Sequence, residues 1–274
     1  MVVFPNAKIN LGLNILRKRA DGYHDIASCF VPLPTYTDVL EILPAQKFSF
    51  SSSGIRIPGI EDDNLCVKAY RLLQKDFQLP AVQIHLHKAI PIGAGLGGGS
   101  ADASFALCCL SEMFELYLDD SILEEYAARL GSDCSFFIKN KPAMAYGTGT
   151  DLAPVNLRLA GLHLVVVTPP IHVGTAEAYA GVRPDASRPD PRTTIEKSPL
   201  PAWKSTLVND FELTVFKKYP SIAEVKDQLY EAGADYASLS GSGASVYAIF
   251  RQQPKLNDVF VRKEKVWQGE LSFE

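Results

Sequence analysis

Five glycines fall within seven residues, Gly93–Gly99, between an alternating apolar segment and a helix-forming run. Glycine permits positive φ angles and lets backbone N–H groups approach a ligand without an intervening Cβ. A helix N-terminus beside such a loop adds unpaired N–H groups and a partial positive charge. So many glycines are costly in conformational entropy if they only form a turn. The segment therefore predicts a phosphate-binding loop that leads into a helix.

The size and composition of the chain exclude several classes of protein. Its 274 residues suggest one large domain or two ordinary ones, with a core that needs no disulfide or metal. The net charge of −4 and the lack of a basic cluster argue against a nucleic-acid binder. Five scattered cysteines are typical of reduced thiols, and we see neither a secretory leader nor a membrane-spanning run. We therefore expect a cytoplasmic protein without nucleic-acid or membrane partners.

Hydrophobic periodicity predicts a mixture of strands and helices. Strands are expected at 6–16, 39–43, 47–51, 81–87 and 161–168, and helices at 65–75, 100–113, 119–130, 205–217 and 221–232. Residues 183–201 are expected to form an exposed, mobile loop, and 236–250 a Gly/Ser hinge between strand-like runs. Because the strands cluster and the helices come in pairs, we expect an α+β fold with domains at 1–153 and 154–274.

Two common phosphate-binding motifs fit the glycine segment poorly. Gly93-x-Gly95-x-x-Gly98 matches the Rossmann fingerprint, but the strand before it alternates with His85 and His87. A Rossmann strand is buried on both faces and should be continuously apolar. A Walker A loop ends in Gly-Lys-Ser/Thr, and the segment from Pro91 to Ser104 contains no lysine.

A third motif fits at nearly every position. Pro91–Ala101 resembles the phosphate loop of the galactokinase, homoserine kinase, mevalonate kinase and phosphomevalonate kinase (GHMP) superfamily. Ala7–Leu11 resembles its first motif and Leu239–Val246 its third, so the resemblance covers most of the chain in the right order. It implies an α+β kinase with two lobes. The N-terminal lobe would have a ribosomal-protein-S5-like topology, and the active site would lie in the cleft between the lobes.

Further segments resemble one branch of this superfamily. They are Pro5–Leu11, Arg19–His24, Gly97–Ser100, Leu130–Asp133 and Asn209–Glu212, of which Arg19–His24 is the most discriminating. The resemblance implies that ATP phosphorylates the 2-hydroxyl of 4-diphosphocytidyl-2-C-methyl-D-erythritol, a small cytidyl diphosphate, in the non-mevalonate isoprenoid pathway. The alternatives are another GHMP small-molecule kinase, such as a homoserine kinase, or a ligand-binding protein that keeps the fold without turnover. The presence of Lys8, Asp133 and all three motifs together disfavours the last.

The resemblance also assigns catalytic roles. Asp133 corresponds to the catalytic aspartate, which would accept the proton of a tertiary alcohol as the P–O bond forms. Lys8 corresponds to the lysine of the first motif, which would keep the carboxylate ionised and offset charge on the transferring group. Asn10 lies two residues further on the same strand face and would orient the hydroxyl. By local sequence alone, Asp133 is as well explained as a turn residue and Lys8 better explained as a solvated lysine.

Aromatic and polar residues correspond to the cytosine site. Tyr23 would stack on the base and His24 would bind its edge, although an isolated Tyr-His pair is more often a plain turn. Tyr179 corresponds to a second stacking ring and Thr175 to a nearby polar contact.

The ATP site would combine the loop backbone with an adenine pocket at Asn64, Leu65 and Lys88, of which Lys88 could simply flank a strand. The residues assigned to ATP are Asn64, Leu65, Lys88, Pro91, Gly93, Gly95, Leu96, Gly97, Gly98, Gly99, Ser100, Ala101 and Gly241. ATP chemistry requires Mg²⁺, and no carboxylate trio suggests a protein metal site, so ATP and water would hold the ion. His85 and His87 have metal-pair spacing without a third ligand, which favours a surface strand over zinc. For the oligomeric state, the sequence is compatible with either a monomer or a homodimer.

Overall fold

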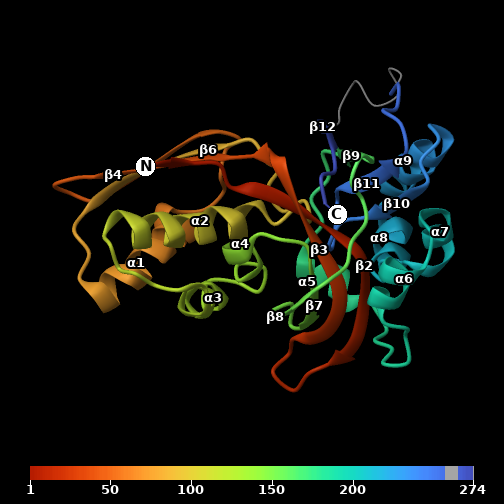
Figure 1. The fold of residues 1–274 in the computed structure, drawn as a ribbon, viewed down its shortest axis with the longest axis horizontal. Coiled ribbons are helices and arrows are strands. Elements are labelled where there is room, and N and C mark those ends of the chain that lie inside the picture. Colours follow the sequence, from red (N-terminus) through yellow and green to blue (C-terminus); the bar gives the residue numbers. More distant parts are fainter. Residues whose placement is uncertain (257–264, 274) are drawn as a thin grey trace. The chain divides into compact units, whose positions relative to one another are not determined.

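The structure is a computed structural model that describes residues 1–256 and 265–273 (Figure 1). The chain folds into two compact units. The first contains Met1–Lys8, Pro32–Ile92 and Gly97–Lys141, and the second contains Ile9–Val31, Gly93–Leu96 and the chain from Pro142 onward. These units do not follow a single break at residue 153, because early segments of the chain belong to the second unit. The domain limits 1–153 and 154–274 stay a prediction.

The first unit is built on a four-stranded sheet in the order β1–β4–β6–β5. The strands are β1 (Val2–Val3), β4 (Val39–Pro44), β5 (Ser49–Gly54) and β6 (Val82–Lys88), and only the β5–β6 pair is parallel. Helices α1 (Leu65–Phe77) and α2 (Gly98–Met113) lie along one face of β4 and β6 (Figure 1). The core between them includes Leu73, Ile84 and Leu107. Shorter helices follow: η1 (Glu61–Asp63) lies before α1, and α3 (Asp120–Ala128) and α4 (Phe136–Lys139) lie after α2.

The second unit contains an antiparallel sheet in the order β10–β11–β9–β12. Its strands are β9 (His163–Thr168), β10 (Tyr236–Leu239), β11 (Val246–Phe250) and β12 (Lys265–Glu270). Helices α8 (Glu212–Lys218) and α9 (Pro220–Glu231) lie beside β10 and β11 (Figure 1). Val165, Ile222 and Leu229 belong to the core there. The unit also contains α5 (Thr175–Ala180), α6 (Pro191–Lys197), η2 (Leu200–Ala202) and α7 (Trp203–Thr206).

A third sheet has the order β2–β3–β7–β8. Its strands are β2 (Asn6–Lys18), β3 (His24–Thr37), β7 (Ala143–Gly147) and β8 (Asp151–Pro154). The sequence predicted most of β2 but none of the other three. Eight consecutive residues of β3 are buried, so the strand shows no alternation of apolar and polar residues.

One loop prediction and one helix prediction are wrong. Within the loop predicted at 183–201, α6 forms because the Asp190 side chain accepts a hydrogen bond from Arg192 N and Pro191 starts the helix. The helix predicted at 205–217 is two helices, since α7 ends at Thr206 and α8 begins at Glu212. The segment 236–250, predicted as a Gly/Ser hinge between strand-like runs, contains β10 and β11, which are joined by a turn at residues 240–245. Within the described part of the chain, no helix combines the length and apolar composition needed to cross a membrane.

Candidate active site

The glycine loop ends where α2 begins, in the first unit. Gly97 is the N-cap of α2 with a left-handed φ of 70°, and Ala101 N donates to Gly97 O at 2.9 Å. The amides that precede Ala101 in α2 have no carbonyl acceptor four residues earlier within the helix. They are therefore available to bind an anion. A Cβ added at Gly97 would lie 3.0 Å from Lys8 Cγ and from Phe137 Cζ. Glycine is thus required at Gly97 by conformation and by the closeness of Lys8.

Lys8 also meets the predicted catalytic carboxylate. Lys8 Nζ lies 3.1 Å from Asp133 Oδ2; the lysine is 3% exposed, whereas the Asp133 side chain is 32% exposed. Ser104 Oγ lies 2.7 Å from Cys134 O and 2.9 Å from Ser100 O, which ties the segment after Asp133 to the first turns of α2. The first unit therefore brings Lys8, Asp133, Gly97 and Ser100 into one place.

The start of α1 lies against the start of α2. The side chain of Asn64 caps α1 by accepting a hydrogen bond from Cys66 N at 2.9 Å. Leu65 Cδ1 would lie 3.9 Å from a Cβ added at Gly99. A pocket of about 250 Å³ is lined by Asn64 itself together with residues 50–52 and 57–61. Asn64 and Leu65 are therefore close to the glycine loop, and a small cavity lies beside them.

The side chain of Lys88 is buried rather than open to a nucleotide. Its ammonium group donates to Asp38 and, at 2.7 Å, to Asp102 Oδ2. Burial alone would lower the pKa of Lys88, but the charges of Asp102 and Asp38 outweigh it and raise that pKa. The assignment of this residue to the ATP site stays a prediction.

In the second unit, the other half of the glycine loop packs against the third motif. Ser240 Oγ donates to Gly95 O at 2.8 Å, and Ser245 N donates to Ala94 O at 3.2 Å. Gly95 has a φ of 77°, and an added Cβ would overlap the carbonyl of Ser240. A Cβ added at Gly241 would lie 3.2 Å from Gly95 Cα and 3.4 Å from Asn10 Oδ1. The predicted residues Gly95, Gly241 and Asn10 are therefore neighbours.

Asn209 supports this packing and was not among the predicted site residues. Its Nδ2 donates to Leu239 O and Gly241 O, both at 2.8 Å, and its Oδ1 accepts from Phe211 N. The signal was present in the sequence as Asn209–Glu212, a segment of the resemblance to which no role was given. His172 was missed as well: its ring carbon Cε1 would lie 2.9 Å from a Cβ added at Gly93. No local pattern indicates that contact.

Predicted substrate residues form an aromatic stack in the second unit. The rings of His24 and Tyr179 are stacked, with centroids 4.5 Å apart and planes 17° apart, and Tyr179 meets Phe211 edge-on at 4.8 Å. Burial, followed by the charge of Lys18, lowers the pKa of His24, which favours the neutral imidazole near pH 7. Tyr23 is exposed and is not part of the stack as the structure describes it. Thr175 Oγ1 lies 3.4 Å from Ser242 Oγ of the third motif.

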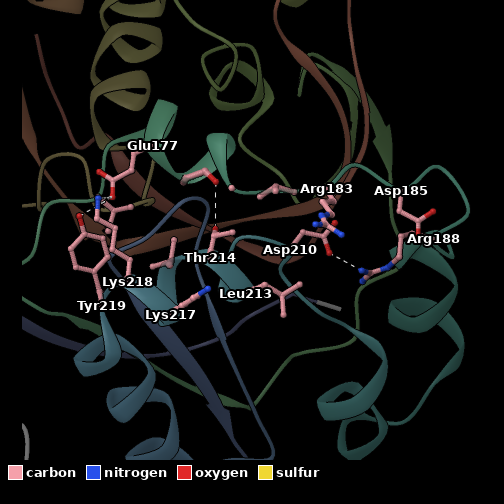
Figure 2. Close-up of a pocket in the computed structure, with 15 residues that line it drawn as sticks. Glu177, Arg183, Asp185, Arg188, Asp210, Leu213, Thr214, Lys217, Lys218 and Tyr219 are labelled. Carbon is pink, nitrogen blue, oxygen red and sulfur yellow. Dashed lines mark hydrogen bonds and ion pairs between the residues drawn. The ribbon is translucent and has the colours of Figure 1, made fainter.

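A larger cavity of the second unit lies away from the predicted residues. It has a volume of about 810 Å³ and, as described, is lined by none of them. Figure 2 shows Asp210 and Arg188 on one side and Glu177 and Lys218 on the other, each pair joined by an ion pair. Because none of the predicted residues lines this cavity, cavity size here does not mark the predicted chemistry.

The predicted surface histidines are held by serines. His85 binds Ser51 and Ser53 through its two ring nitrogens at 2.8 and 3.0 Å, and His87 Nδ1 lies 2.9 Å from Ser53 Oγ. Among residues 1–256 and 265–273, no group of three or more His, Cys, Asp or Glu side chains is placed to hold a metal ion.

Comparison with known proteins defines the class of this enzyme. Residues 64–147 match the GHMP kinases N terminal domain, and residues 200–262 match the GHMP kinases C terminal domain. The chain belongs to the GHMP kinases, a family of phosphotransferases, and the predicted α+β fold class is confirmed.

Full-length relatives narrow this assignment. The chain is 49% identical over 275 residues to 4-diphosphocytidyl-2-C-methyl-D-erythritol kinase of Bacteroides fragilis, covering 99% of this chain and 100% of the relative. The same enzyme of Cytophaga hutchinsonii is 50% identical over 256 residues, with 93% and 94% covered. Within the GHMP kinases, the chain therefore belongs to the family of 4-diphosphocytidyl-2-C-methyl-D-erythritol kinases.

Solved structures of similar proteins support the same family assignment. A crystal structure of 4-(cytidine 5'-diphospho)-2C-methyl-D-erythritol kinase matches with a TM-score of 0.78 and 32% identity, covering 91% of this chain and 90% of that one. A homoserine kinase from Cytophaga hutchinsonii matches with a TM-score of 0.72 but only 15% identity, covering 97% and 95%, so that likeness concerns the fold alone.

Proposed function

We propose that this enzyme transfers the γ-phosphoryl group of ATP to the 2-hydroxyl of 4-diphosphocytidyl-2-C-methyl-D-erythritol, in the non-mevalonate pathway to isoprenoids. The observation that carries the chemical part is the contact of Lys8 with Asp133 beside the start of α2. The names of relatives about half identical to the chain support the choice of acceptor.

Asp133 is the proposed general base. Its side chain is partly exposed, so a substrate hydroxyl can reach it, and the carboxylate takes the proton as the P–O bond forms. Lys8 is buried and fixes the position of the carboxylate through the ion pair. Its positive charge would also offset the negative charge that develops on the phosphoryl group. Asn10 is proposed to orient the hydroxyl, with its amide donating to Ser28 Oγ at 3.0 Å in the structure.

The start of α2 is the proposed phosphate site. Its unpaired amides and partial positive charge favour an anion, and Ser100 adds a hydroxyl in the first turn. Asn64 and Leu65, with the small pocket beside them, are proposed to receive the adenine. Mg²⁺ bound by ATP oxygens and water would neutralise the phosphates.

The stack of His24 and Tyr179 is the proposed cytosine site. Aromatic faces bind a base through stacking, and a neutral imidazole both donates and accepts hydrogen bonds. Because the two rings already contact each other, Tyr179 can stack on a base and His24 can bind the edge of that base only if the rings separate. Tyr23 and Thr175 are proposed to contribute further contacts. All five cysteines are free, which suits the cytoplasmic location that we propose.

A turnover assay tests the proposal directly. Purified enzyme with ATP, Mg²⁺ and the cytidyl substrate is expected to produce ADP and one equivalent of phosphorylated product. Homoserine serves as the competing acceptor. ADP formation with homoserine, and none above background with the cytidyl substrate, would contradict the proposed acceptor.

A further inference from the structure

Two carboxylates enclose one ammonium group beneath the first turns of α2. Lys88, at the end of β6, donates to Asp38 and to Asp102 Oδ2. All three residues are buried, at 3% exposure or less. Burying ions costs free energy that pairing returns only in part, and apolar residues of similar volume often stabilise a fold as well. Stability alone is therefore a weak explanation for this network.

The network contacts both ends of the glycine segment. Before the segment, Asp38 Oδ1 accepts hydrogen bonds from Ala89 N at 2.6 Å and Ile90 N at 2.8 Å. After it, Asp102 belongs to α2, and a Cβ added at Gly98 would lie 3.0 Å from Lys88 Nζ. One side chain thus binds the backbone that leads into the loop, while the ammonium lies directly under the residue that starts the helix.

The charges of the network do not balance without a proton. Two carboxylates and one ammonium leave an excess negative charge, and Asp102 Oδ1 has no hydrogen-bond partner in the part of the chain that the structure describes. Burial raises the pKa of Asp102 to about 7, while Lys88 from β6 opposes this rise and Asp38 adds to it. The Cys66 thiol of α1 also faces the group, and burial raises the pKa of this thiol well above its usual value. A proton on Asp102 removes the excess charge, and a pKa of about 7 means that this carboxyl carries the proton below about pH 7.

We propose that Asp38, Lys88 and Asp102 are positioning residues for ATP, which fix the two ends of the glycine segment so that the amides at the start of α2 face the phosphates. This inference rests on the proposed ATP role of the loop. It gives Lys88 a role different from direct contact with the nucleotide, because its ammonium acts through Gly98 and Asp102.

Substitution of Asp102 tests the proposal. Asp102→Ala leaves the Lys88–Asp38 pair neutral but removes the link to α2. We expect it to raise the KM for ATP at least about tenfold, and to change the KM for the cytidyl substrate less than about twofold. Asp102→Asn keeps the acceptor for Lys88 and should restore the KM for ATP to within about twofold of the wild-type value.

A control separates positioning from loss of stability. Leu73→Ala removes a fully buried apolar side chain from the core of the same unit and leaves the three charged residues of the network in place. It is expected to lower the Tm without changing the KM for ATP. If Asp102→Ala lowers the Tm as Leu73→Ala does, and leaves the KM for ATP within about twofold of wild type, the positioning role is wrong.

Two further measurements keep the outcome decisive. If Asp102→Ala does not fold, Lys88→Arg is the second variant to test. It keeps the positive charge but places a larger group against Gly98. Unchanged ATP affinity in Lys88→Arg would overturn the proposal. Calorimetric titration with Mg-ADP separates this proposal from the proposed function. Wild-type enzyme that binds Mg-ADP without phosphorylating the cytidyl substrate contradicts only the acceptor, and the nucleotide affinity of Asp102→Ala still tests the positioning role.

Discussion

Lys8 Nζ lies 3.1 Å from Asp133 Oδ2, although the two residues come from opposite ends of the first unit's sequence. The two partners differ in exposure, since the lysine is buried and the aspartate is partly open. An ion pair with one buried and one open member holds the open carboxylate in a fixed direction while a ligand can still reach it. This arrangement suits a general base whose substrate arrives from solvent.

Removal of this carboxylate is the most direct test of the chemistry. Asp133→Asn keeps the shape of the side chain but cannot accept the proton, so kcat should fall by at least about 100-fold while ATP binding persists. Steady-state kinetics and nucleotide titration measure the two effects. Glu125→Gln, at an exposed carboxylate of α3, is the matched control and should retain wild-type turnover. Near-wild-type kcat in Asp133→Asn would refute the role of base.

The two halves of the glycine loop should respond oppositely to a methyl group. Gly95→Ala places Cβ into the Ser240 carbonyl at a positive φ, so we expect it to destabilise the fold by more than about 1 kcal/mol. Gly99→Ala has ordinary helical geometry, with its nearest atom 3.9 Å away, and should raise stability by roughly 0.5–1 kcal/mol. Urea unfolding of both variants checks this. Equal effects would mean that Gly95 does not pack against the third motif as described.

The aromatic stack should distinguish pyrimidines. CMP is expected to raise the Tm of the wild-type enzyme and UMP to raise it less, because His24 binds the base edge. Tyr179→Ala should abolish most of the CMP effect, since it removes one stacking face. Tyr117→Ala, at a tyrosine that is 87% exposed, is the control and should keep it. Equal protection by CMP and UMP would contradict base recognition by His24.

Asp102 should make stability depend on pH. Its pKa rises from 3.8 in the unfolded reference to about 7 in the folded enzyme, so the folded state binds the proton more tightly. The associated stability is complete at acidic pH below 3.8 and is lost as pH rises toward about 7.

The comparison with Asp102→Asn isolates this effect, because the amide does not titrate. The difference in free energy of unfolding, wild type minus variant, should fall between about pH 4 and about pH 7 and stay level above that range. Chemical denaturation at several pH values measures it. A difference that rises with pH would show that Asp102 is ionised in the folded state.

Several features were readable from the sequence because their causes are local. The alternation at 81–87 reflects a strand with one buried face, and β6 has that burial pattern. Asn64 begins α1 through a bond to an amide two residues away. The glycine segment and its two companion motifs identified the family, which the comparisons confirmed.

Other features depended on distant partners. The helix predicted at 205–217 breaks because Leu13 exchanges backbone hydrogen bonds with Val208 and Asp210, and because Asn209 binds Leu239 O and Gly241 O. Such contacts override a helical pattern that considers only neighbours along the chain. Strand β3 was missed because burial on both faces removes the alternation that marks a strand.

By itself, the sequence determined the glycine loop that leads into α2, the family and the residue types available for catalysis, since these depend on glycine freedom, capping and motif order. Only the tertiary structure decided which charges meet. It paired Lys8 with Asp133, and it placed Lys88 between Asp38 and Asp102 where the sequence suggested a nucleotide contact. The physical reason is that ion pairing depends on distance in space and on burial, and local periodicity determines neither for residues far apart in the chain.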